Sequence, residues 1–208
     1  MKPLQISFLF LIFISCQQKQ SKTLVVSNYA EPKTFAEKLS KAAISIIDPS
    51  IDYDPTYYKK IDYPNGDVPK GKGVCTDVII RSYRILNIDL QKEIHEDIIE
   101  NFSLYPNLKK WGMTKTDTNI DHRRVPNLEV FFERKGIKLP VTQNAKEYKT
   151  GELVTWMIND KLPHIGIVTN KKSKDGKRNL IVHNVGNGQV LEDCLFEYKI
   201  VGHFKYEK

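Results

Sequence analysis

The chain has 208 residues, of which 40% are hydrophobic and 27% charged, so it fits one globular domain after removal of an export segment. It contains no internal repeat or low-complexity tract, which excludes solenoids, propellers and disordered arrays. Lysine and arginine exceed aspartate and glutamate by seven. Because basic and acidic residues are interleaved, this charge does not predict nucleic-acid binding. It is consistent with contact to an anionic polymer or membrane surface, and equally with a soluble basic protein.

The N-terminus has the three-part layout of a signal peptide. Lys2 precedes an apolar stretch over residues 6–14, which is too short to span a bilayer. The segment Phe13-Ile14-Ser15-Cys16 resembles a bacterial lipobox, whose cysteine is acylated and becomes the mature N-terminus. Simple secretion is the alternative. We therefore predict a cell-envelope lipoprotein with a signal peptide over 1–15, lipidation at Cys16, a membrane tether over 16–32 and one domain over 33–208.

Apolar residues at helical spacing predict four helices before residue 140. The predicted helices start at Thr34, at Cys75, after the N-cap Asp89 and around Leu128, and they end at Asp48-Pro49, near Asn87, at Tyr105-Pro106 and at Gly136. Between the first two, residues 53–73 contain four tyrosines and repeated proline and glycine, which predicts an ordered loop. Its tyrosines, Tyr63 among them, either line a substrate groove or pack the loop onto the domain.

After Gly151 the pattern changes to short β-rich runs. Strands are predicted over 152–158, 164–169, 180–184 and 198–206, with a hairpin turn over 171–177 around Asp175-Gly176. Helices come first and an antiparallel sheet second, so the predicted fold class is α+β.

Cys75 directly follows the glycine-rich turn Gly71-Lys72-Gly73 and opens a predicted helix. Free backbone N–H groups and the helix dipole favour a thiolate there, and the same N–H groups can hold an oxyanion. A buried structural cysteine fits the position equally well. Cys194 lies beside acidic residues that oppose a thiolate, so we predict a structural role for it. A disulfide between Cys75 and Cys194 is the remaining possibility in an oxidising compartment.

A thiol nucleophile needs a base, and His164 has the most suitable context. Strand alternation places His164 and Gly166 on one face, where the glycine leaves room for substrate or a helix end. A structural histidine is the alternative. The next strand brings His183 alongside, and either His183 or Asn184 could orient the base, because the two point to opposite faces. The histidines lack paired ligand spacing, so we predict no metal site and no cofactor.

A polar cluster, Asp121-His122-Arg123-Arg124, precedes the last predicted helix. Two arginines can clamp a substrate carboxylate through forked hydrogen bonds, or they can pin the loop by binding backbone carbonyl groups. Asp77 lies one helical turn from Arg81 and could form a supporting ion pair with it. The predicted substrate-binding residues are Tyr63, Asp77, Asp121, Arg123 and Arg124.

Two segments resemble known wall hydrolases. Residues 151–156 (Gly-Glu-Leu-Val-Thr-Trp) and 164–168 (His-Ile-Gly-Ile-Val) resemble the strand pair of NlpC-type and CHAP-type peptidoglycan hydrolases, and Ile181-Val182-His183 resembles their third strand. The resemblance implies a papain-like fold, Cys75 as nucleophile on a helix, His164 as base, His183 as third polar residue and cleavage of wall-peptide amide bonds. Those hydrolases commonly carry Asp before the cysteine and Ser after it, whereas Val74 and Thr76 stand here.

A closer resemblance covers most of the mature chain. The matching segments are Tyr63-Pro64, residues 66–69, 73–78 and 120–128, and Gly202-His203-Phe204, and they resemble the YijF-like bacterial family, known as domain of unknown function 1287. This family supplies no established reaction. From the resemblance to the wall hydrolases and the setting of Cys75 we expect a monomeric cysteine amidase or peptidase that acts on peptidoglycan peptide through an acyl-enzyme. The alternatives are a non-catalytic, lipid-anchored wall-binding protein and a thiol acyl or peptidyl transferase.

Overall fold

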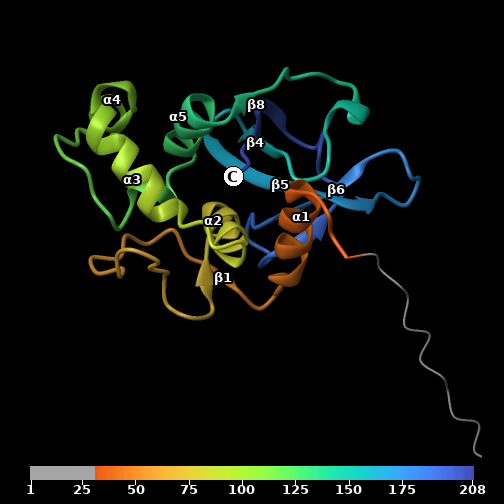
Figure 1. The fold of residues 1–208 in the computed structure, drawn as a ribbon, viewed down its shortest axis with the longest axis horizontal. Helices are drawn as coiled ribbons and strands as arrows, with labels where there is room; N and C mark the ends of the chain where they lie inside the picture. The colour runs from red at the N-terminus through yellow and green to blue at the C-terminus, as the bar shows by residue number, and fades with distance from the viewer. Residues whose placement is uncertain (1–30) are drawn as a thin grey trace, which may run out of the picture. The chain divides into compact units, whose positions relative to one another are not determined.

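The structure, a computed structural model, describes residues 31–208 of the chain (Figure 1). The predicted signal peptide, the lipidation site Cys16 and nearly all of the predicted tether over 16–32 lie outside the described residues. Residues Pro32–Lys208 fold as one unit. Of the helices in this unit, none has both the length and the apolar character needed to cross a bilayer.

The described chain begins with helices, as predicted. The α-helices are α1 (Phe35–Ser45), α2 (Cys75–Ile85), α3 (Leu90–Asn101), α4 (Asn107–Trp111) and α5 (Val125–Lys135), and the 3-10 turns are η1 (Phe102–Leu104), η2 (Asp121–Arg123) and η3 (Ala145–Glu147). The four predicted helices are confirmed as α1, α2, α3 and α5. The sequence pattern missed α4, because five residues are too few to show a helical period.

Side-chain caps set the starts of two of these helices. The Thr34 hydroxyl accepts the Glu37 N–H at 3.2 Å, and the Glu37 carboxylate accepts the Thr34 N–H at 3.0 Å, which makes a capping box at α1. At α3, the Asp89 carboxylate accepts the Lys92 N–H. Each cap satisfies backbone donors that have no partner inside the helix.

The second half of the chain forms a six-stranded antiparallel sheet in the order β3-β8-β4-β5-β6-β7. Its strands are β3 (Ile137–Lys138), β4 (Leu153–Ile158), β5 (Leu162–Lys172), β6 (Asn179–His183), β7 (Val190–Glu192) and β8 (Lys199–Lys205). A separate parallel pair, β1 (Asp52–Tyr53) and β2 (Lys72–Gly73), closes the base of the tyrosine-containing loop. The α+β class, the four predicted strands and the hairpin are confirmed. The very short β3 and β7 gave too little alternation to be predicted.

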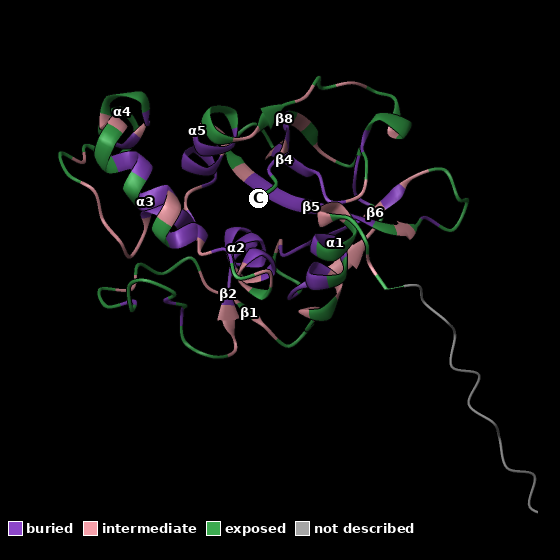
Figure 2. Cartoon of the chain, in the orientation of Figure 1, coloured by how far each residue is buried: buried purple, intermediate pink, exposed green. Residues whose placement is uncertain are grey.

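The two faces of the sheet are covered differently. Helices α1, α2 and α5 pack against one face, which we call the helix face, and α3 packs on α2 and α5. The helix face presents Leu153, Ile165, Ile167, Val182 and Phe204. The opposite face, here the loop face, presents Val154, Trp156, Val168 and Ile181 and is covered by Tyr148, Cys194 and Leu195 from connecting segments. Figure 2 shows that β5 and the side of α2 facing it are among the most buried parts of the chain.

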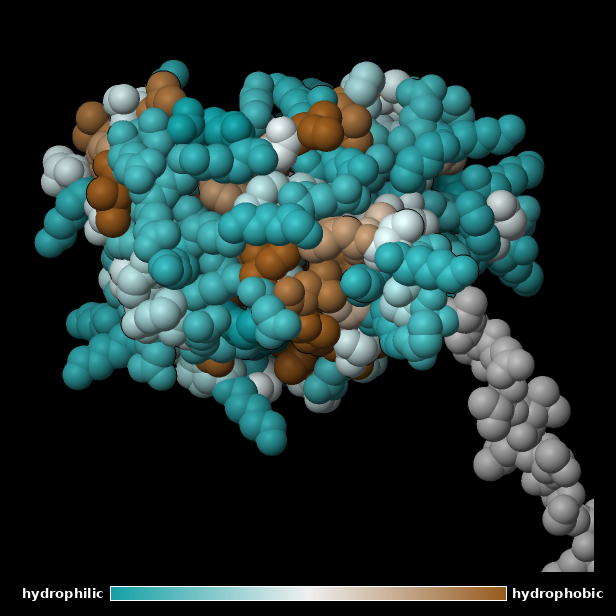
Figure 3. Space-filling model, in the orientation of Figure 1, coloured by the Kyte–Doolittle hydropathy of each residue, from teal (hydrophilic) through white to brown (hydrophobic). Residues whose placement is uncertain are grey.

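The outer surface is largely hydrophilic. Exposed apolar side chains such as Ile85, Ile99 and Leu108 lie on different helices. Figure 3 shows a mostly hydrophilic face with a hydrophobic area near its centre and smaller ones toward its edges. Single exposed apolar residues of this kind are normal in globular proteins.

The turn at Gly151 gives a direct test of how closely α1 approaches the sheet. Gly151 has φ +81°, and a Cβ there would lie 2.6 Å from the Ala36 Cα, whereas Gly176 has φ +72° and no heavy atom within 4 Å of such a Cβ. We predict that Gly176→Ala lowers the free energy of unfolding by about 1 to 2 kcal/mol through its left-handed backbone alone. Gly151→Ala should lower it by about 1 to 3 kcal/mol more, because it also overlaps α1. Urea unfolding of both variants measures this, and equal losses would contradict the close packing.

Candidate active site

Cys75 is the first residue of α2 and lines a pocket of about 190 Å³. The backbone N–H groups of Ile165 and Thr76 interact with its sulfur and favour the thiolate. Burial has the larger effect and raises the pKa of the Cys75 thiol to about 12. At neutral pH the resting thiol is therefore protonated, and attack on a carbonyl carbon requires a base.

The turn that carries Cys75 is held by a buried ion pair. Oδ2 of Asp77 accepts the Val74 N–H at 2.7 Å, and Arg123 donates to both oxygens of Asp77 at 3.2 Å. Arg123 also donates to the carbonyl oxygens of Thr56 and Asp54 at 3.0 and 3.1 Å. Burial raises the pKa of Asp77, and the charge of Arg123 opposes that rise. The pair places a carboxylate at the N-terminus of α2, where the helix dipole favours it.

Arg81 lies near Asp77, as predicted, and its charge opposes the rise in the pKa of Asp77, but the two form no direct ion pair. Arg81 instead donates to Asp67 at 2.9 and 3.0 Å and to the carbonyl oxygen of Lys72 at 2.7 Å. Asp77 takes Arg123, 46 positions along the chain, because both side chains are buried at the same point. Asp77 is thus engaged by protein groups and does not line the pocket.

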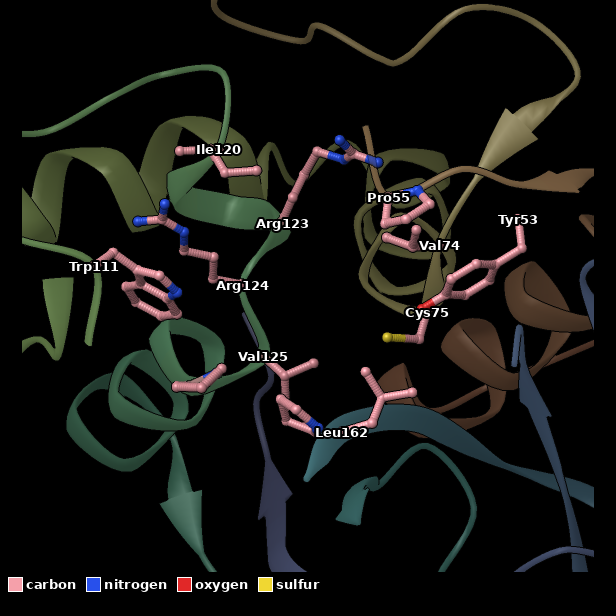
Figure 4. Close-up of a pocket in the computed structure, with 12 residues that line it drawn as sticks. Tyr53, Pro55, Val74, Cys75, Trp111, Ile120, Arg123, Arg124, Val125 and Leu162 are labelled. Atoms are coloured by element: carbon pink, nitrogen blue, oxygen red, sulfur yellow. The ribbon is translucent and has the colours of Figure 1, made fainter. Parts of the chain in front are cut away.

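The pocket extends from Cys75 to a stacked pair of side chains, Trp111 and Arg124 (Figure 4). The other lining residues are mostly apolar, namely Tyr53, Pro55, Val74, Ile120, Arg123, Val125, Pro126, Leu162 and Pro163. Burial and the neighbouring Cys75 raise the pKa of Tyr53 to about 12. Its hydroxyl is therefore protonated at neutral pH and can donate a hydrogen bond.

His164 and His183 meet on the loop face. Nε2 of His164 lies 2.9 Å from Nδ1 of His183, whose Nε2 lies 2.9 Å from the Glu192 carboxylate. Because a carboxylate can only accept, His183 donates to Glu192 through Nε2 and accepts from His164 through Nδ1. The His164 ring also lies 5.8 Å from the ring of Trp156, its partner on β4. Burial, aided by His183, lowers the pKa of His164 to about 3.

Cys75 and His164 therefore lie on opposite faces of β5. Cys75 belongs to the cluster that contains Ile165 and Ile167 on the helix face, whereas His164 points with Trp156 to the loop face. Successive side chains on a strand alternate between faces. The expected Cys75–His164 pair is not formed in this conformation. The alternation of the sequence correctly puts His164 and Gly166 on one face but does not tell which face receives Cys75.

Gly166 makes room for a neighbouring strand and not for a helix end. A Cβ at this position would lie 2.6 Å from the Ile181 side chain and 3.2 Å from the His183 Cβ, both on β6. Asn184, the other candidate for the third polar residue, is buried and lies 3.5 Å from the Gly73 carbonyl oxygen in the turn before Cys75. The two candidates are thus divided, with His183 beside His164 and Asn184 beside the Cys75 turn.

Of the five residues predicted to bind substrate, Arg123 and Arg124 line the pocket. Asp121 is buried, and its Oδ2 contacts His95 Nδ1 at 2.9 Å and accepts the Asp117 N–H at 2.8 Å, so it pins its loop. Tyr63 packs edge-on against the His95 ring at 5.2 Å and does not line the pocket. Sequence reasoning missed Trp111, which belongs to the unpredicted helix α4, and did not separate Tyr53 from the other tyrosines of its loop.

Both cysteines of the described chain are free and buried. Cys194 belongs to the loop-face cluster, and burial raises the pKa of its thiol to about 12. Within residues 31–208, no three His, Cys, Asp or Glu side chains are arranged to hold a metal ion.

Comparison with known proteins identifies relatives over most of the described chain. The family model described as Domain of unknown function (DUF1287) matches residues 40–206. The uncharacterized protein YijF of Escherichia coli (strain K12) is 46% identical over 154 residues, which cover 74% of this chain and 73% of YijF. No solved structure matches the chain.

The ion pair under Cys75 predicts that Arg123 supports the fold and does not bind substrate directly. Arg123→Met should lower the free energy of unfolding by about 3 to 5 kcal/mol, because it leaves the buried Asp77 carboxylate without its counter-charge. Arg178 pairs with Asp193 at the surface, so Arg178→Met is the matched control and should cost less than about 1 kcal/mol. Urea unfolding measures both. A stable Arg123→Met variant that binds wall peptide poorly would return Arg123 to a substrate-binding role.

Proposed function

The chain belongs to the DUF1287 family, and we propose that it is a cysteine-dependent amidase or peptidase that cuts bacterial cell-wall peptide through an acyl-enzyme. The observation that supports this most is the position of Cys75, at the first turn of α2, on a pocket wall, with backbone N–H groups beside its sulfur. Nucleophilic thiols with oxyanion donors are built in this way. The proposal includes a papain-like arrangement of the NlpC and CHAP type.

In the proposed reaction the Cys75 sulfur attacks the carbonyl carbon of an amide bond as its proton passes to a base. The oxyanion takes hydrogen bonds from the Cys75 and Thr76 N–H groups at the start of α2 and from the Tyr53 hydroxyl. The C–N bond then breaks, the amine leaves with the proton, and a thioester remains on Cys75. Water attacks the thioester, which releases a carboxylate and restores the thiol.

The base in this proposal is His164. To act on Cys75, its imidazole must move from the loop face of the sheet to the helix face. His164 directly precedes Ile165, whose N–H contacts the thiol, but its imidazole is bonded to His183 on the loop face. The registered pairs of β5 with β6 begin at Ile167, so the first residues of β5 are held in register by β4. Turning this end of β5 brings His164 to Cys75, where Asn184 already lies on the helix face and can orient it.

A second function, a non-catalytic binder of wall peptide, is favoured by one observation. Among residues 31–208 no imidazole is hydrogen-bonded to the thiol, and burial keeps its pKa at about 12, so the resting conformation is better suited to holding a peptide than to cutting it. Acyl or peptidyl transfer would use the same thiol and differ only in whether an amine replaces water. The proposal includes, for each of the three functions, a location in the cell envelope and a lipid anchor at Cys16.

Digestion of purified peptidoglycan separates the enzyme from the binder. We expect wild type and Cys194→Ala to release the same wall fragments in mass spectrometry, because Cys194 is on the loop face and away from the pocket. Cys75→Ala should release none while keeping its circular dichroism spectrum, since it lacks the nucleophile. Fragments from Cys75→Ala equal to those of wild type would end the proposal. Folded wild type that binds the wall without releasing fragments would favour the binder.

The pH dependence of Cys75 alkylation tests the role of His164. A thiol whose pKa is raised to about 12 by burial is protonated at neutral pH, so alkylation by iodoacetamide should rise only as the pH approaches that value. If His164 reaches the thiol, its imidazole, which is neutral above about pH 3, can take the Cys75 proton, and wild type will show an additional rise far below the pH at which the thiol alone ionises. We expect that additional rise in wild type and its loss in His164→Gln. Identical pH profiles of alkylation in the two proteins would show that His164 does not reach Cys75 and is not the base.

A further inference from the structure

We propose that Arg124 and Trp111 form a subsite for a carboxylate on the side of the pocket opposite Cys75, so that the substrate is an acidic peptide. Figure 4 shows the thiol pointing into the cavity and the stacked Trp111 and Arg124 at its far side, with the Arg124 side chain extending away from Cys75. The identity of the cut bond in this inference rests on the proposed function, whereas carboxylate binding does not. A volume of about 190 Å³ is below the range of pockets that enclose drug-sized ligands, so the carboxylate lies within one or two residues of the bound carbonyl.

The guanidinium of Arg124 is held in one orientation by protein groups. Its central carbon lies 4.0 Å from the centre of the Trp111 ring, and its Nη1 donates to the Asn107 amide oxygen at 3.2 Å and contacts the Met113 sulfur. Asn107 is itself fully buried, and its amide oxygen also accepts from Asn127. Stacking on an aromatic ring fixes the plane of a guanidinium and leaves its edges available.

The edge left available suits a carboxylate. The contacts of Arg124 with described residues use Nη1, and within residues 31–208 no hydrogen-bond acceptor is assigned to its Nε or Nη2. These two nitrogens form the side edge of the guanidinium, which binds both oxygens of a carboxylate through parallel hydrogen bonds.

Arg124 also lacks a paired counter-charge. It forms no ion pair within 4.0 Å among residues 31–208, although it is half-buried and burial lowers its pKa. Asp117 and Asp121 are near enough to oppose that shift, but Asp117 is bonded to the Tyr57 hydroxyl at 2.7 Å and Asp121 to His95 at 2.9 Å. A half-buried charge without a partner is unfavourable, and a ligand carboxylate would compensate it. The two nearby aspartates disfavour a doubly charged phosphate at the same place.

Arg123 shows that a position on the pocket wall is not sufficient for an arginine to bind a ligand carboxylate. It lines the same pocket, but its donors are taken by Asp77, Asp54 and Thr56, and Figure 4 shows its guanidinium turned away from the cavity centre. Of the two arginines in the predicted clamp, Arg124 is therefore the one free to select the substrate.

Calorimetric binding to the Cys75→Ala chain tests the subsite without turnover. The probes are two peptide pairs: acetyl-Ala-Ala-Ala against its C-terminal amide, and acetyl-Ala-Glu-Ala-amide against acetyl-Ala-Gln-Ala-amide. The first pair tests a terminal carboxylate and the second a side-chain carboxylate. We expect the acid to bind about 10-fold to 100-fold more tightly than its neutral partner in at least one pair, as for a hydrogen bond to a charged group.

Substitutions at the subsite should remove this preference selectively. Adding Arg124→Gln should make acid and neutral peptides bind alike, whereas Arg178→Gln, which changes a partly exposed arginine paired with Asp193 away from the pocket, should leave the preference intact. Arg124→Lys keeps the charge but loses the fork and should retain only part of the preference. Trp111→Leu should weaken binding of the acid about 2-fold to 5-fold, because the stacked ring no longer holds the guanidinium.

The inference is overturned if acid and neutral peptides bind equally in both pairs, if none of the four binds at millimolar concentration, or if the preference survives Arg124→Gln. These outcomes are independent of hydrolysis. A wild-type chain that digests peptidoglycan but shows no carboxylate preference supports the proposed function and contradicts the subsite. A chain that binds the acid peptide preferentially but hydrolyses no peptidoglycan supports the carboxylate subsite and contradicts the proposed hydrolase function.

Discussion

The buried ion pair between Asp77 and Arg123 joins three segments that are far apart in the sequence. Asp77 holds the first turn of α2, and therefore Cys75, while Arg123 ties that turn to η2 and, through two carbonyl groups, to residues 54–56. The segments α2 and η2, which both line the pocket, are thus held together by one ion pair. Neither partner is stable alone in this place, since removing either leaves an uncompensated buried charge. The position of the thiol and the shape of the pocket depend on this contact.

The sheet then divides the polar chemistry of the chain between its two faces. The thiol, Tyr53 and Asn184 are on or beside the helix face, whereas His164, His183 and Glu192 form a hydrogen-bonded series on the loop face. Each set is well ordered by local contacts. Because β5 separates them, a cysteine hydrolase on this fold must bring an imidazole around that strand, whereas a peptide-binding protein needs only the pocket as it stands.

Arg123 and Arg124 illustrate how adjacent identical residues acquire different roles. The 3-10 turn η2 ends between them, so one side chain points toward the buried Asp77 and the other lies on the ring of Trp111. The first is saturated by protein acceptors, and the second keeps an edge for a ligand. From the sequence both arginines suggest one carboxylate clamp, and in the structure only Arg124 can act as one.

Local pattern was sufficient for much of the fold. The spacing of apolar residues predicts α1, α2, α3 and α5, alternation predicts the main strands, and the glycine-rich turn before Cys75 predicts a thiol at a helix start. These features depend on residues a few positions apart, whose geometry follows from helical and strand periods. The closeness of His164 and His183 follows likewise from one hairpin.

Partners chosen across long distances in the chain were decided by tertiary packing. Asp77 pairs with Arg123 and not with its helical neighbour Arg81, and the sheet turns His164 away from Cys75. A strand period tells which residues share a face, but which element covers that face depends on how the helices dock. The sequence by itself therefore determined the class of the fold and the setting of Cys75 at a helix start. The tertiary structure decided which ion pair holds that helix start and on which side of β5 the His164 imidazole lies.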